Sequence, residues 1–366
     1  MKHSKKYKFD YFLAIVACIL VIIGILVLAS VSATFSQEKF GRTTYYLFHQ
    51  IIYGLIFGII FGFIAFKIKL SFLRKYAWIF ILINLVLMAL VFIPKVGIVA
   101  GGAPRWINMG FTTFQPSEFL KLTFVLYLSA LLSSFLKNKK AFTLIPFLVI
   151  LGILALLLAL QSDLSTLTVI ISVGILMYFS SGFPLWHTAL AILICVGGIL
   201  GLIKIAPYRM KRILVFLNPG TDPMGMGYQL KQILIAVGSG GIFGLGLNMS
   251  VQKFGWIPQT MSDSIFAIFA EETGFVGSMV LIFLFLLLLW RGLRIAKMSH
   301  DKFSQLLAIG ISCWICIQAF INIGAMIGIL PLTGIPLPFI SYGGSHIIAE
   351  LVGIGILLNI SKLNKR

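Results

Sequence analysis

Several acidic residues of this chain lie in apolar surroundings, where an ionised carboxylate is energetically unfavourable. Of the ten aspartates and glutamates, six fall inside apolar runs or at their ends. Placing a charged side chain at membrane depth costs at least about 2.5 kcal/mol, so such a residue is by default a candidate for function. It can serve as a general base or as the partner of a cation. The six are Glu118, Asp163, Asp263, Glu271, Glu272 and Glu350.

The basic residues are distributed unevenly. Most of the 29 lysines and arginines lie in five short segments, at 2–8, 67–75, 137–140, 291–302 and 362–366. Because cytoplasmic loops are enriched in lysine and arginine, this pattern places both termini in the cytoplasm. Most of the others lie around 95–121 and 204–253, which are then extracytoplasmic. Binding of an anionic group such as phosphate explains them as well as contact with lipid headgroups does.

The composition decides what kind of protein carries these residues. Hydrophobic residues make up 60% of the chain and charged residues 11%, whereas a soluble domain has roughly a quarter charged residues. The long apolar runs do not alternate, which excludes a β-barrel. The fold class is therefore all-α, a single polytopic membrane domain over residues 1–366. Ten transmembrane helices are expected, near 11–33, 46–66, 77–94, 117–136, 143–161, 164–181, 186–205, 263–290, 305–330 and 345–361.

Two segments lie outside these spans. Residues 1–10 form a basic cytoplasmic tail, and residues 206–262 form the one long extracytoplasmic loop. Glycine and proline recur in the loop and its apolar runs are short, so it holds no soluble-domain core. Residues 227–237 are expected to form a short amphipathic helix at the membrane surface. Long loops inside compact proteins tend to be functional.

The three acids near the extracytoplasmic helix ends also have structural explanations. Glu118 follows a proline at a helix start and can pair with Lys121, one turn further on. Asp163 suits the N-cap of the sixth span, and Asp263 can likewise cap the eighth.

The remaining three acids lie within spans. Glu271 and Glu272 point about 100° apart on a helix, so only one of them is expected to face the interior. Glu350 is a packing or gating residue in the last span. The residues alone leave two classes open, an enzyme acting on a lipid-linked phosphate at the outer face and a transporter with acidic coupling sites.

Six motifs occur in the order in which one family carries them. They are GAPRWI at 102–107, QPSEFLKL at 115–122, NPGTDPMGMGYQ at 218–229, SVQK at 250–253, MSDSIFAIFAEE at 261–272 and PLPFISYGGS at 336–345. Together they resemble the SEDS polymerases, whose members include FtsW and RodA. Two departures concern helix geometry more than chemistry. QSDLST at 161–166 replaces the usual Q-P-D-L-G-T, and Ser262 and Ser264 flank the aspartate in place of Thr and Phe.

The resemblance implies a peptidoglycan glycosyltransferase that polymerises lipid II into glycan strands outside the cytoplasmic membrane. The SVQK run and the basic N-terminal tail favour an FtsW-like septal enzyme over a RodA-like elongation enzyme. The resemblance also implies a class B penicillin-binding protein, a transpeptidase, as partner, together with other division proteins. No nucleic-acid partner is expected.

Asp263 is the expected catalytic residue, because it matches the family's catalytic aspartate at a helix start beside the loop. The acceptor hydroxyl of the sugar has a pKa far above 7 and needs a general base. With one base and an α-linked donor, a single displacement would give a β-linked product by inversion. A carboxylate at the membrane interface has a raised pKa, which makes it a better base.

The leaving group is a lipid diphosphate, which departs more easily where fixed cations meet its charge. Arg105 and Lys121 have the best claim because they lie in motifs. The full set of candidate cations is Arg105, Lys121, Arg209, Lys211, Arg212 and Lys253.

Five further residues are substrate-site candidates. Glu118 and Asp163 would orient groups or pair with cations, and Trp106 would stack on a sugar or anchor at the interface. Ser341 and Tyr342 would supply polar contacts.

No metal motif is present, and the histidines are isolated; a divalent cation bridging diphosphate and acids stays open. A lipid II flippase is the rival class, but the chemistry-bearing residues cluster on one side, which favours the enzyme.

Overall fold

The computed structural model describes residues 9–100, 103–110, 112–138 and 144–363, so the first eight residues of the predicted basic tail lie outside it. In this part, eight helices are long and apolar enough to cross a membrane, and two shorter apolar helices fill the fifth and sixth predicted positions. They are α1 (Tyr11–Phe40), the continuous α2 (Tyr45–Gln50), η1 (Ile51–Ile56) and α3 (Phe57–Lys67), α4 (Leu70–Leu90), α5 (Pro116–Asn138), α6 (Leu144–Leu160), α7 (Leu164–Ser180), α8 (Leu185–Ile205), α11 (Ile265–Met298), α12 (Lys302–Met326) and α13 (Gly344–Leu363). The predicted helical membrane bundle is confirmed.

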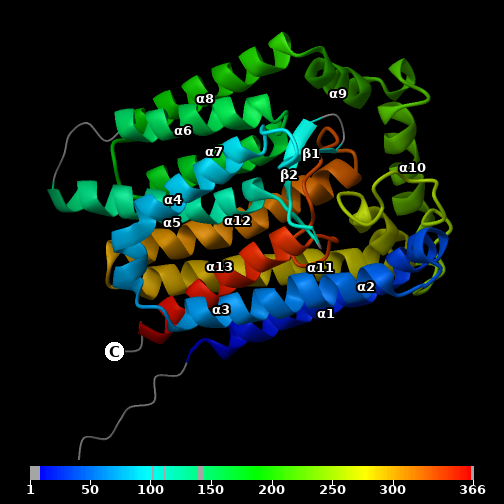
Figure 1. The fold of residues 1–366 in the computed structure, drawn as a ribbon, viewed down its shortest axis with the longest axis horizontal. Helices are drawn as coiled ribbons and strands as arrows, with labels where there is room; N and C mark the ends of the chain where they lie inside the picture. Colours follow the sequence, from blue (N-terminus) through cyan, green and yellow to red (C-terminus); the bar gives the residue numbers. More distant parts are fainter. Residues whose placement is uncertain (1–8, 101–102, 111, 139–143, 364–366) are drawn as a thin grey trace, which may run out of the picture.

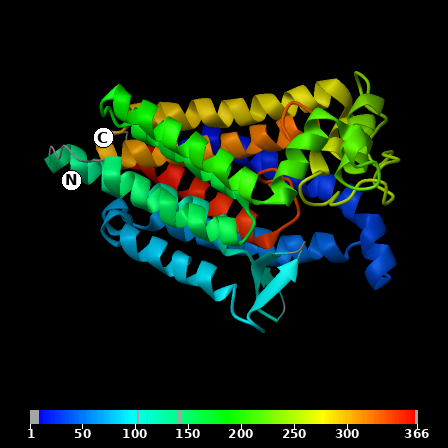
Figure 2. The ribbon, with the colours of Figure 1, turned by 90° about the horizontal axis from the view of Figure 1, so that it is seen from above.

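The helices run side by side, and α12 lies in the middle (Figures 1 and 2). In the most apolar stretch of α12, 78% is buried inside the protein, whereas the corresponding share for α8 is 17%. The central helix packs against α5, α7, α11 and α13. At one end the backbone N–H of Asp10 donates to Ser361 Oγ, which places the start of α1 beside the end of α13. Both ends of the chain therefore lie on one side of the bundle.

The segments between helices gather at the opposite end, where α9 (Pro207–Leu217), η2 (Pro219–Thr221) and α10 (Met226–Ser239) lie (Figure 1). The predicted helix at 227–237 is confirmed as α10. Its buried residues recur every third position, at Gly227, Leu230, Ile233 and Ala236, which gives it one face against α11. Helix α9 was not predicted, because its charged and apolar residues occur within a loop rich in glycine and proline.

A small antiparallel sheet also went unpredicted. It consists of β1 (Gly97–Ala100), β2 (Ala103–Asn108) and β3 (Thr113–Phe114), in the order β1-β2-β3. Strands this short give no clear alternation in the sequence. The sheet carries Arg105 and Trp106 on β2 and leads directly into α5.

Helix α11 is interrupted at Gly274, where φ is +68° and ψ is −164°. The segment after α10 bonds the backbone groups that the interruption leaves without helical partners. The N–H groups of Leu245 and Gly246 donate to the carbonyls of Glu271 and Glu272, at 3.0 and 3.1 Å. A Cβ on residue 274 would lie 2.3 Å from the amide nitrogen of Gly244, so only glycine fits. The interruption therefore anchors the long loop, residues 206–262, in the bundle.

The irregular segment 331–343 connects α12 to α13 and is embedded among the helices. Its residues Ile335, Leu337, Phe339 and Ile340 are buried. Non-helical backbone is tolerated at such depth only where the protein covers it. Helix α1 approaches it so closely that a Cβ on Gly24 would lie 2.2 Å from the carbonyl oxygen of Phe339.

Replacing Gly274 with alanine should destabilise the protein, because the new side chain meets backbone on two sides and the φ angle is unfavourable. We expect a loss of about 1–3 kcal/mol in the free energy of unfolding from the backbone conformation alone. Thermal unfolding of the detergent-solubilised protein measures it. Gly152→Ala in α6, where a Cβ meets nothing within 4 Å, is the matched control and should not lower the midpoint. Equal behaviour of the two variants would contradict the tight contact.

Candidate active site

Asp263 lies two residues before α11, at the end of the bundle that carries the loops. Its side chain is half-buried, and its Oδ1 accepts a hydrogen bond from Ser262 Oγ at 2.9 Å. Its backbone carbonyl accepts one from Asn322 Nδ2, at 2.7 Å. The predicted capping role is wrong: the N-cap residue of α11 is Ser264, and Asp263 accepts no bond from the helix. Its carboxylate is therefore left for another purpose.

The turn that carries Asp263 is fastened to the 331–343 segment. Ser341 Oγ donates to the carbonyl of Ser262, and the N–H of Tyr342 donates to the carbonyl of Met261 at 2.8 Å. Asn322 completes the attachment, because its Nδ2 also donates to the carbonyl of Ile335 at 2.8 Å. The position of Asp263 thus depends on residues that are far away in the sequence.

Burial raises the pKa of Asp263 to about 6. The hydrogen bond from Ser262 and the positive charge of Arg212 act in the opposite direction and lower the pKa. A carboxyl group with this pKa is mostly ionised at neutral pH and still accepts a proton more readily than an ordinary aspartate.

A cavity of about 180 Å³ lies between α7, α9 and the 331–335 part of the connecting segment. Asp263 does not line it, but Asn322 Nδ2 bonds the carbonyls of both Asp263 and Ile335, and Ile335 is one of the lining residues. Arg209 and Arg212 line it together with Ser162 and Ser165. Arg212 Nη1 donates to the carbonyl of Leu332 at 3.3 Å. Both guanidinium groups bond only neutral oxygens among the described residues, so their charge is not cancelled.

Two polar atoms in this cavity have no partner among the described residues: Arg212 Nε and Thr333 Oγ1 are buried without a hydrogen bond. Arg209 holds its place by donating to the carbonyls of Leu202 and Ala159, both at 2.9 Å. Desolvation lowers the pKa of the Arg209 guanidinium, yet an arginine stays charged at neutral pH. The cavity is therefore lined by fixed cations.

Of the other candidate cations, Lys253 and Lys211 are paired with carboxylates, and Arg105 bonds neutral oxygens. Lys253 is buried and lies 3.3 Å from Glu272. Lys211 is 52% exposed and pairs with Asp222 at 3.0 Å, and Lys211 lowers the pKa of that carboxyl. Arg105 donates to the carbonyls of Gln161 and Ser162, at 3.0 and 2.6 Å, and so lies at the cavity's edge.

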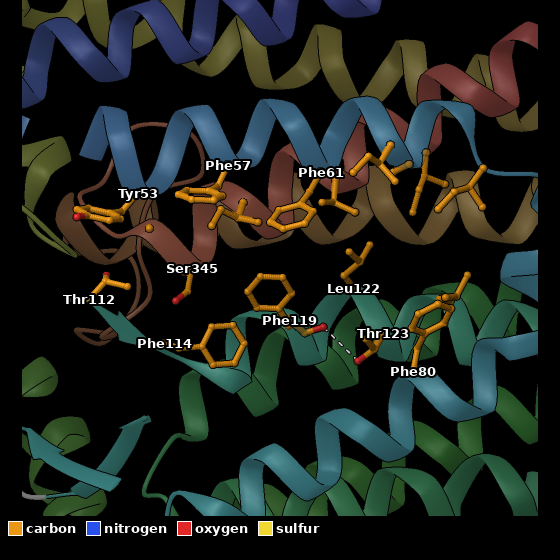
Figure 3. A pocket seen from close by; sticks show the side chains of 18 of the residues that line it. Tyr53, Phe57, Phe61, Phe80, Thr112, Phe114, Phe119, Leu122, Thr123 and Ser345 are labelled. Carbon is orange, nitrogen blue, oxygen red and sulfur yellow. Dashed lines mark hydrogen bonds between the residues drawn. The ribbon is translucent and has the colours of Figure 1, made fainter. Parts of the chain in front are cut away.

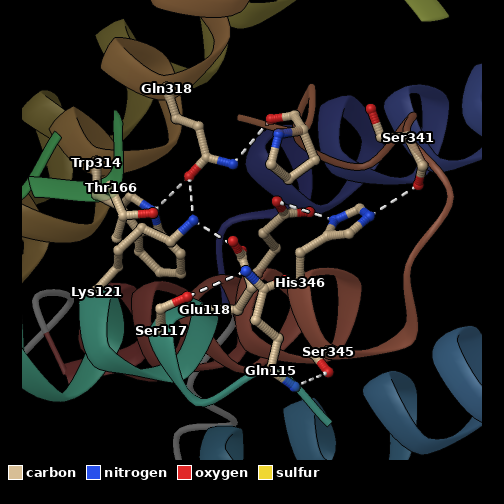
Figure 4. A network of polar contacts seen from close by, with 12 residues as sticks. Gln115, Ser117, Glu118, Lys121, Thr166, Trp314, Gln318, Ser341, Ser345 and His346 are labelled. Carbon is tan, nitrogen blue, oxygen red and sulfur yellow. Dashed lines mark hydrogen bonds and ion pairs between the residues drawn. The ribbon is translucent and has the colours of Figure 1, made fainter. Parts of the chain in front are cut away.

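Glu118 and Lys121 form the predicted ion pair, with Lys121 Nζ 2.7 Å from Glu118 Oε2 (Figure 4). Both side chains are almost fully buried, and Nζ also donates to Gln318 Oε1 at 2.7 Å. Gln318 in turn accepts from Trp314 Nε1 and donates to the carbonyl of Pro336. The pair joins α5, α12 and the connecting segment, and Lys121 is neutralised there.

Asp163 is the N-cap residue of α7, as predicted. Its two oxygens accept from the N–H and the hydroxyl of Thr166, at 3.1 and 2.8 Å. The expectation that only one of Glu271 and Glu272 faces the interior is wrong, since both are buried. Because α11 breaks at Gly274, the loop reaches both: Ser250 Oγ donates to Glu271, and Lys253 Nζ donates to Glu272 at 3.3 Å. Glu272 also accepts from Ser30 Oγ of α1, at 2.7 Å.

Trp106, Ser341 and Tyr342 occupy different surroundings. Trp106 is partly buried on β2, opposite Ile98. Ser341 is fully buried and its hydroxyl bonds the protein. The hydroxyl of Tyr342 lies 2.9 Å from His49 Nδ1, and burial raises its pKa. His49 therefore has a partner within the protein, as expected for a histidine in a packing or interface role.

A larger cavity, of about 550 Å³, does not contain Asp263 and was not predicted. It is an apolar groove between α3, α4, α5 and α13. Phe57 and Phe61 line one side, and Phe119 and Leu122 the other (Figure 3). Ser345, just after the segment that holds Asp263, lies toward one end (Figure 3). Its residues are scattered over the sequence, and lipid-facing and groove-lining side chains have the same composition, so no local pattern reveals it.

No three or more histidine, cysteine, aspartate or glutamate residues gather to hold a metal ion within the described ranges. This leaves the sugar-transfer roles of Asp263 and the arginines to be considered on their own geometry.

Comparison with known proteins decides the family. Residues 10–366 match the model of the cell cycle proteins FtsW, RodA and SpoVE. The chain belongs to this family. It is 40% identical to stage V sporulation protein E of Bacillus subtilis, over 99% of both chains. It is 37% identical to the probable peptidoglycan glycosyltransferase FtsW of Coxiella burnetii, over 98% of both.

Solved structures of the family share its fold. A chain of a peptidoglycan synthase complex matches with a TM-score of 0.81 and 26% identity, over 98% of this chain and 99% of that one. The rod shape determining protein RodA of Thermus thermophilus matches with a TM-score of 0.73 and 25% identity, over 99% of both chains. The predicted family and the enzyme class, a peptidoglycan glycosyltransferase, are confirmed by these relatives.

Removing one partner of the buried Glu118–Lys121 pair should be strongly destabilising. Lys121→Met leaves the Glu118 carboxylate unpaired, for which we expect a loss of about 3–5 kcal/mol in unfolding free energy. The double variant Glu118→Gln, Lys121→Met removes both charges and should recover most of that loss. Thermal unfolding in detergent compares the two. A double variant as unstable as Lys121→Met would show that charge pairing is not what holds this contact.

Proposed function

We propose that this family member polymerises lipid II into glycan strands and releases undecaprenyl diphosphate, with Asp263 as the general base. The observation that carries the proposal is the position of Asp263, half-buried and fastened through Asn322 to Ile335, which lines a cavity together with Arg209 and Arg212. A lipid-linked sugar diphosphate requires a base for the sugar hydroxyl, cations for the diphosphate and an apolar groove for the lipid chain.

In the proposed step, Asp263 takes the proton of the C4 hydroxyl of the acceptor sugar while that oxygen attacks the anomeric carbon of the donor. The bond between that carbon and the diphosphate oxygen breaks, and the electron pair leaves with the diphosphate. Protonated Asp263 then returns its proton to water. A base with a pKa of about 6 is suited to such transfer near neutral pH.

Arg209 and Arg212 are the best-placed groups to stabilise the departing diphosphate. They line the cavity that Ile335 also lines, and the described part of the chain offers them no carboxylate partner. Planar guanidinium groups bind phosphate oxygens in a two-point manner. Arg105 would extend this site from the edge, with Trp106 next to it on β2 to stack on a sugar.

The remaining candidates are proposed to support the site. Lys121 with Glu118, and Lys253 with Glu272, hold the segments around it, and Lys211 contributes a surface charge near the loop. Asp163 positions the turn that Arg105 bonds. Ser341 and Tyr342 hold the base and border the substrate.

A single displacement with inversion fits this arrangement. A covalent intermediate would need a second free carboxylate as nucleophile, whereas Glu118 and Asp163 are both occupied by protein partners. Asp263 is then proposed as the base, because its carboxylate accepts a side-chain hydrogen bond from Ser262 alone among the described residues.

The apolar groove is proposed to hold the polyprenyl chain of one substrate. Its volume of about 550 Å³ and its aromatic and aliphatic lining suit a long isoprenoid. It runs between spans, and Ser345, near the segment that carries Ser341, lies toward one end of it (Figure 3). A chain bound there would bring its headgroup toward the loop end of the bundle.

The proposed cell biology is septal synthesis at the division site, in the cytoplasmic membrane, with both termini inside and the site outside. A class B penicillin-binding protein is the proposed partner, within the division complex. The match to a chain of a peptidoglycan synthase complex supports a protein partner. The alternatives are a RodA-type elongation polymerase and a lipid II flippase.

Replacing Asp263 with asparagine tests the proposal. Purified Asp263→Asn should polymerise lipid II at least about 100-fold more slowly, because the amide cannot accept the proton. Binding of lipid II should be retained. Glu38→Gln, at an exposed acid near the end of α1, is the matched control and should be fully active. Unchanged polymerisation by Asp263→Asn would overturn the base, and translocation of lipid II without polymer would favour the flippase.

The pH dependence gives a second prediction. Since the base must be ionised, kcat/KM should fall as the pH drops through about 6, the pKa of Asp263. Arg212→Met removes a charge that lowers this pKa, so its acidic limb should lie at higher pH and its maximal rate should fall. Polymerisation rates between pH 5 and 8 measure both, a range set by roughly one to two units around the pKa. If the acidic limb of Arg212→Met does not move, the charge of Arg212 does not act on the pKa of Asp263.

A further inference from the structure

Two ionisable residues of α13 have no role in the function proposed above. Glu350 is fully buried and His346, one turn earlier, is 3% exposed. The sequence predicted Glu350 as a packing or gating residue and His346 as a satisfied packing or interface residue. His346 has such partners: its Nδ1 lies 3.4 Å from Glu350 Oε1. A carboxylate and an imidazole so deep in a bundle need a reason.

Both residues hold the 331–343 segment. The other oxygen of Glu350, Oε2, accepts a hydrogen bond from the N–H of Phe339 at 2.7 Å. His346 Nε2 lies 2.8 Å from the carbonyl of Ser341 (Figure 4). A carbonyl can only accept, so Nε2 carries a hydrogen. The contact between Nδ1 and Oε1 then requires one more proton, carried by either group.

The backbone to which Glu350 is hydrogen-bonded is strained. Phe339 has a φ of +64°, in the left-handed region that bulky residues avoid. Such a conformation persists only where its surroundings enforce it. The turn is closed on its other side by Ser341, whose Oγ accepts from the N–H of Leu337 at 2.8 Å.

From Ser341 the contacts continue to the active site. Its hydroxyl donates to the carbonyl of Ser262, and Ser262 Oγ donates to Asp263 Oδ1 at 2.9 Å. The next residue, Tyr342, bonds the carbonyl of Met261. An unbroken series of hydrogen bonds thus runs from Glu350 and His346 through Ser341 to the carboxylate of Asp263.

We propose that Glu350 and His346 are positioning residues, which fix the strained turn at 337–341 and through Ser341 and Ser262 set the orientation of the catalytic carboxylate. This rests on the proposed role of Asp263 as base. Neither residue touches substrate. The other charged groups that face His346 are Glu118 and Lys121 of α5, which neutralise one another.

The decisive comparison uses Ser341, where a small change interrupts the series. Ser341→Ala removes the hydroxyl and should lower kcat at least tenfold with KM for lipid II within twofold of the wild type. The acidic limb of the pH–rate profile should move to higher pH, because the Ser262 hydrogen bond lowers the pKa of Asp263. Ser341→Thr keeps a hydroxyl and should restore most of kcat and the position of the limb.

Glu350→Leu should reproduce the effects of Ser341→Ala, since it frees the turn at its other end. The double variant should be no more than about twofold slower than the slower single variant, because both interrupt one series. Asn359→Leu is the matched control: Asn359 is a buried polar residue of α13 that donates to the carbonyls of Ala65 and Ile68, far from the turn. It should lower the thermal midpoint and leave kcat and the limb unchanged.

Three results would overturn the proposal: wild-type kcat in Ser341→Ala, equal impairment in Ser341→Thr, or an acidic limb that does not move. Should Glu350→Leu fail to fold, the Ser341 pair still decides. Asp263→Asn is measured in the same assay. If it is active, the base is wrong; if it is inactive while Ser341→Ala behaves as the wild type, only the positioning is wrong.

Discussion

The attachment of the Asp263 turn to the 331–343 segment is the contact on which the site depends. Ser341 and Tyr342 bond the carbonyls of Ser262 and Met261, and Asn322 bonds those of Asp263 and Ile335. Irregular backbone in the interior of a membrane bundle must satisfy its own polar groups. Here the two irregular segments satisfy each other, and this fixes one carboxylate at the loop end of the bundle.

The high cost of an unpaired buried charge explains the placement of the other acids. Glu118 pairs with Lys121, Glu272 with Lys253, and Glu350 with His346, while Asp163 and Glu271 accept bonds from hydroxyl and N–H groups. Within the described residues, Asp263 differs from all of these. It has one hydroxyl donor and a nearby guanidinium, and burial raises its pKa to about 6. The acid with the fewest protein partners is the one that is available for chemistry.

Local sequence features predicted a large part of this arrangement. Apolar run length gave the helices, a proline and spacing of three gave the Glu118–Lys121 pair, and motif order gave the family. Contacts between segments that are distant in the sequence could not be predicted from these local features. The interruption at Gly274 depends on residues 241–246, which bond the exposed ends of the helix, and this brings both Glu271 and Glu272 inside.

The relative importance of the cations shows the same limit. Motif membership favoured Arg105 and Lys121, whereas Arg209 and Arg212 line the cavity and Lys121 is neutralised.

The most direct test is a structure of the Asp263→Asn variant with lipid II bound. The account predicts the acceptor C4 oxygen within about 2.6–3.2 Å of the side chain at 263, or one water away, with diphosphate oxygens on Arg209 and Arg212. An acceptor oxygen out of reach of that side chain, or a diphosphate bound away from both arginines, would contradict it.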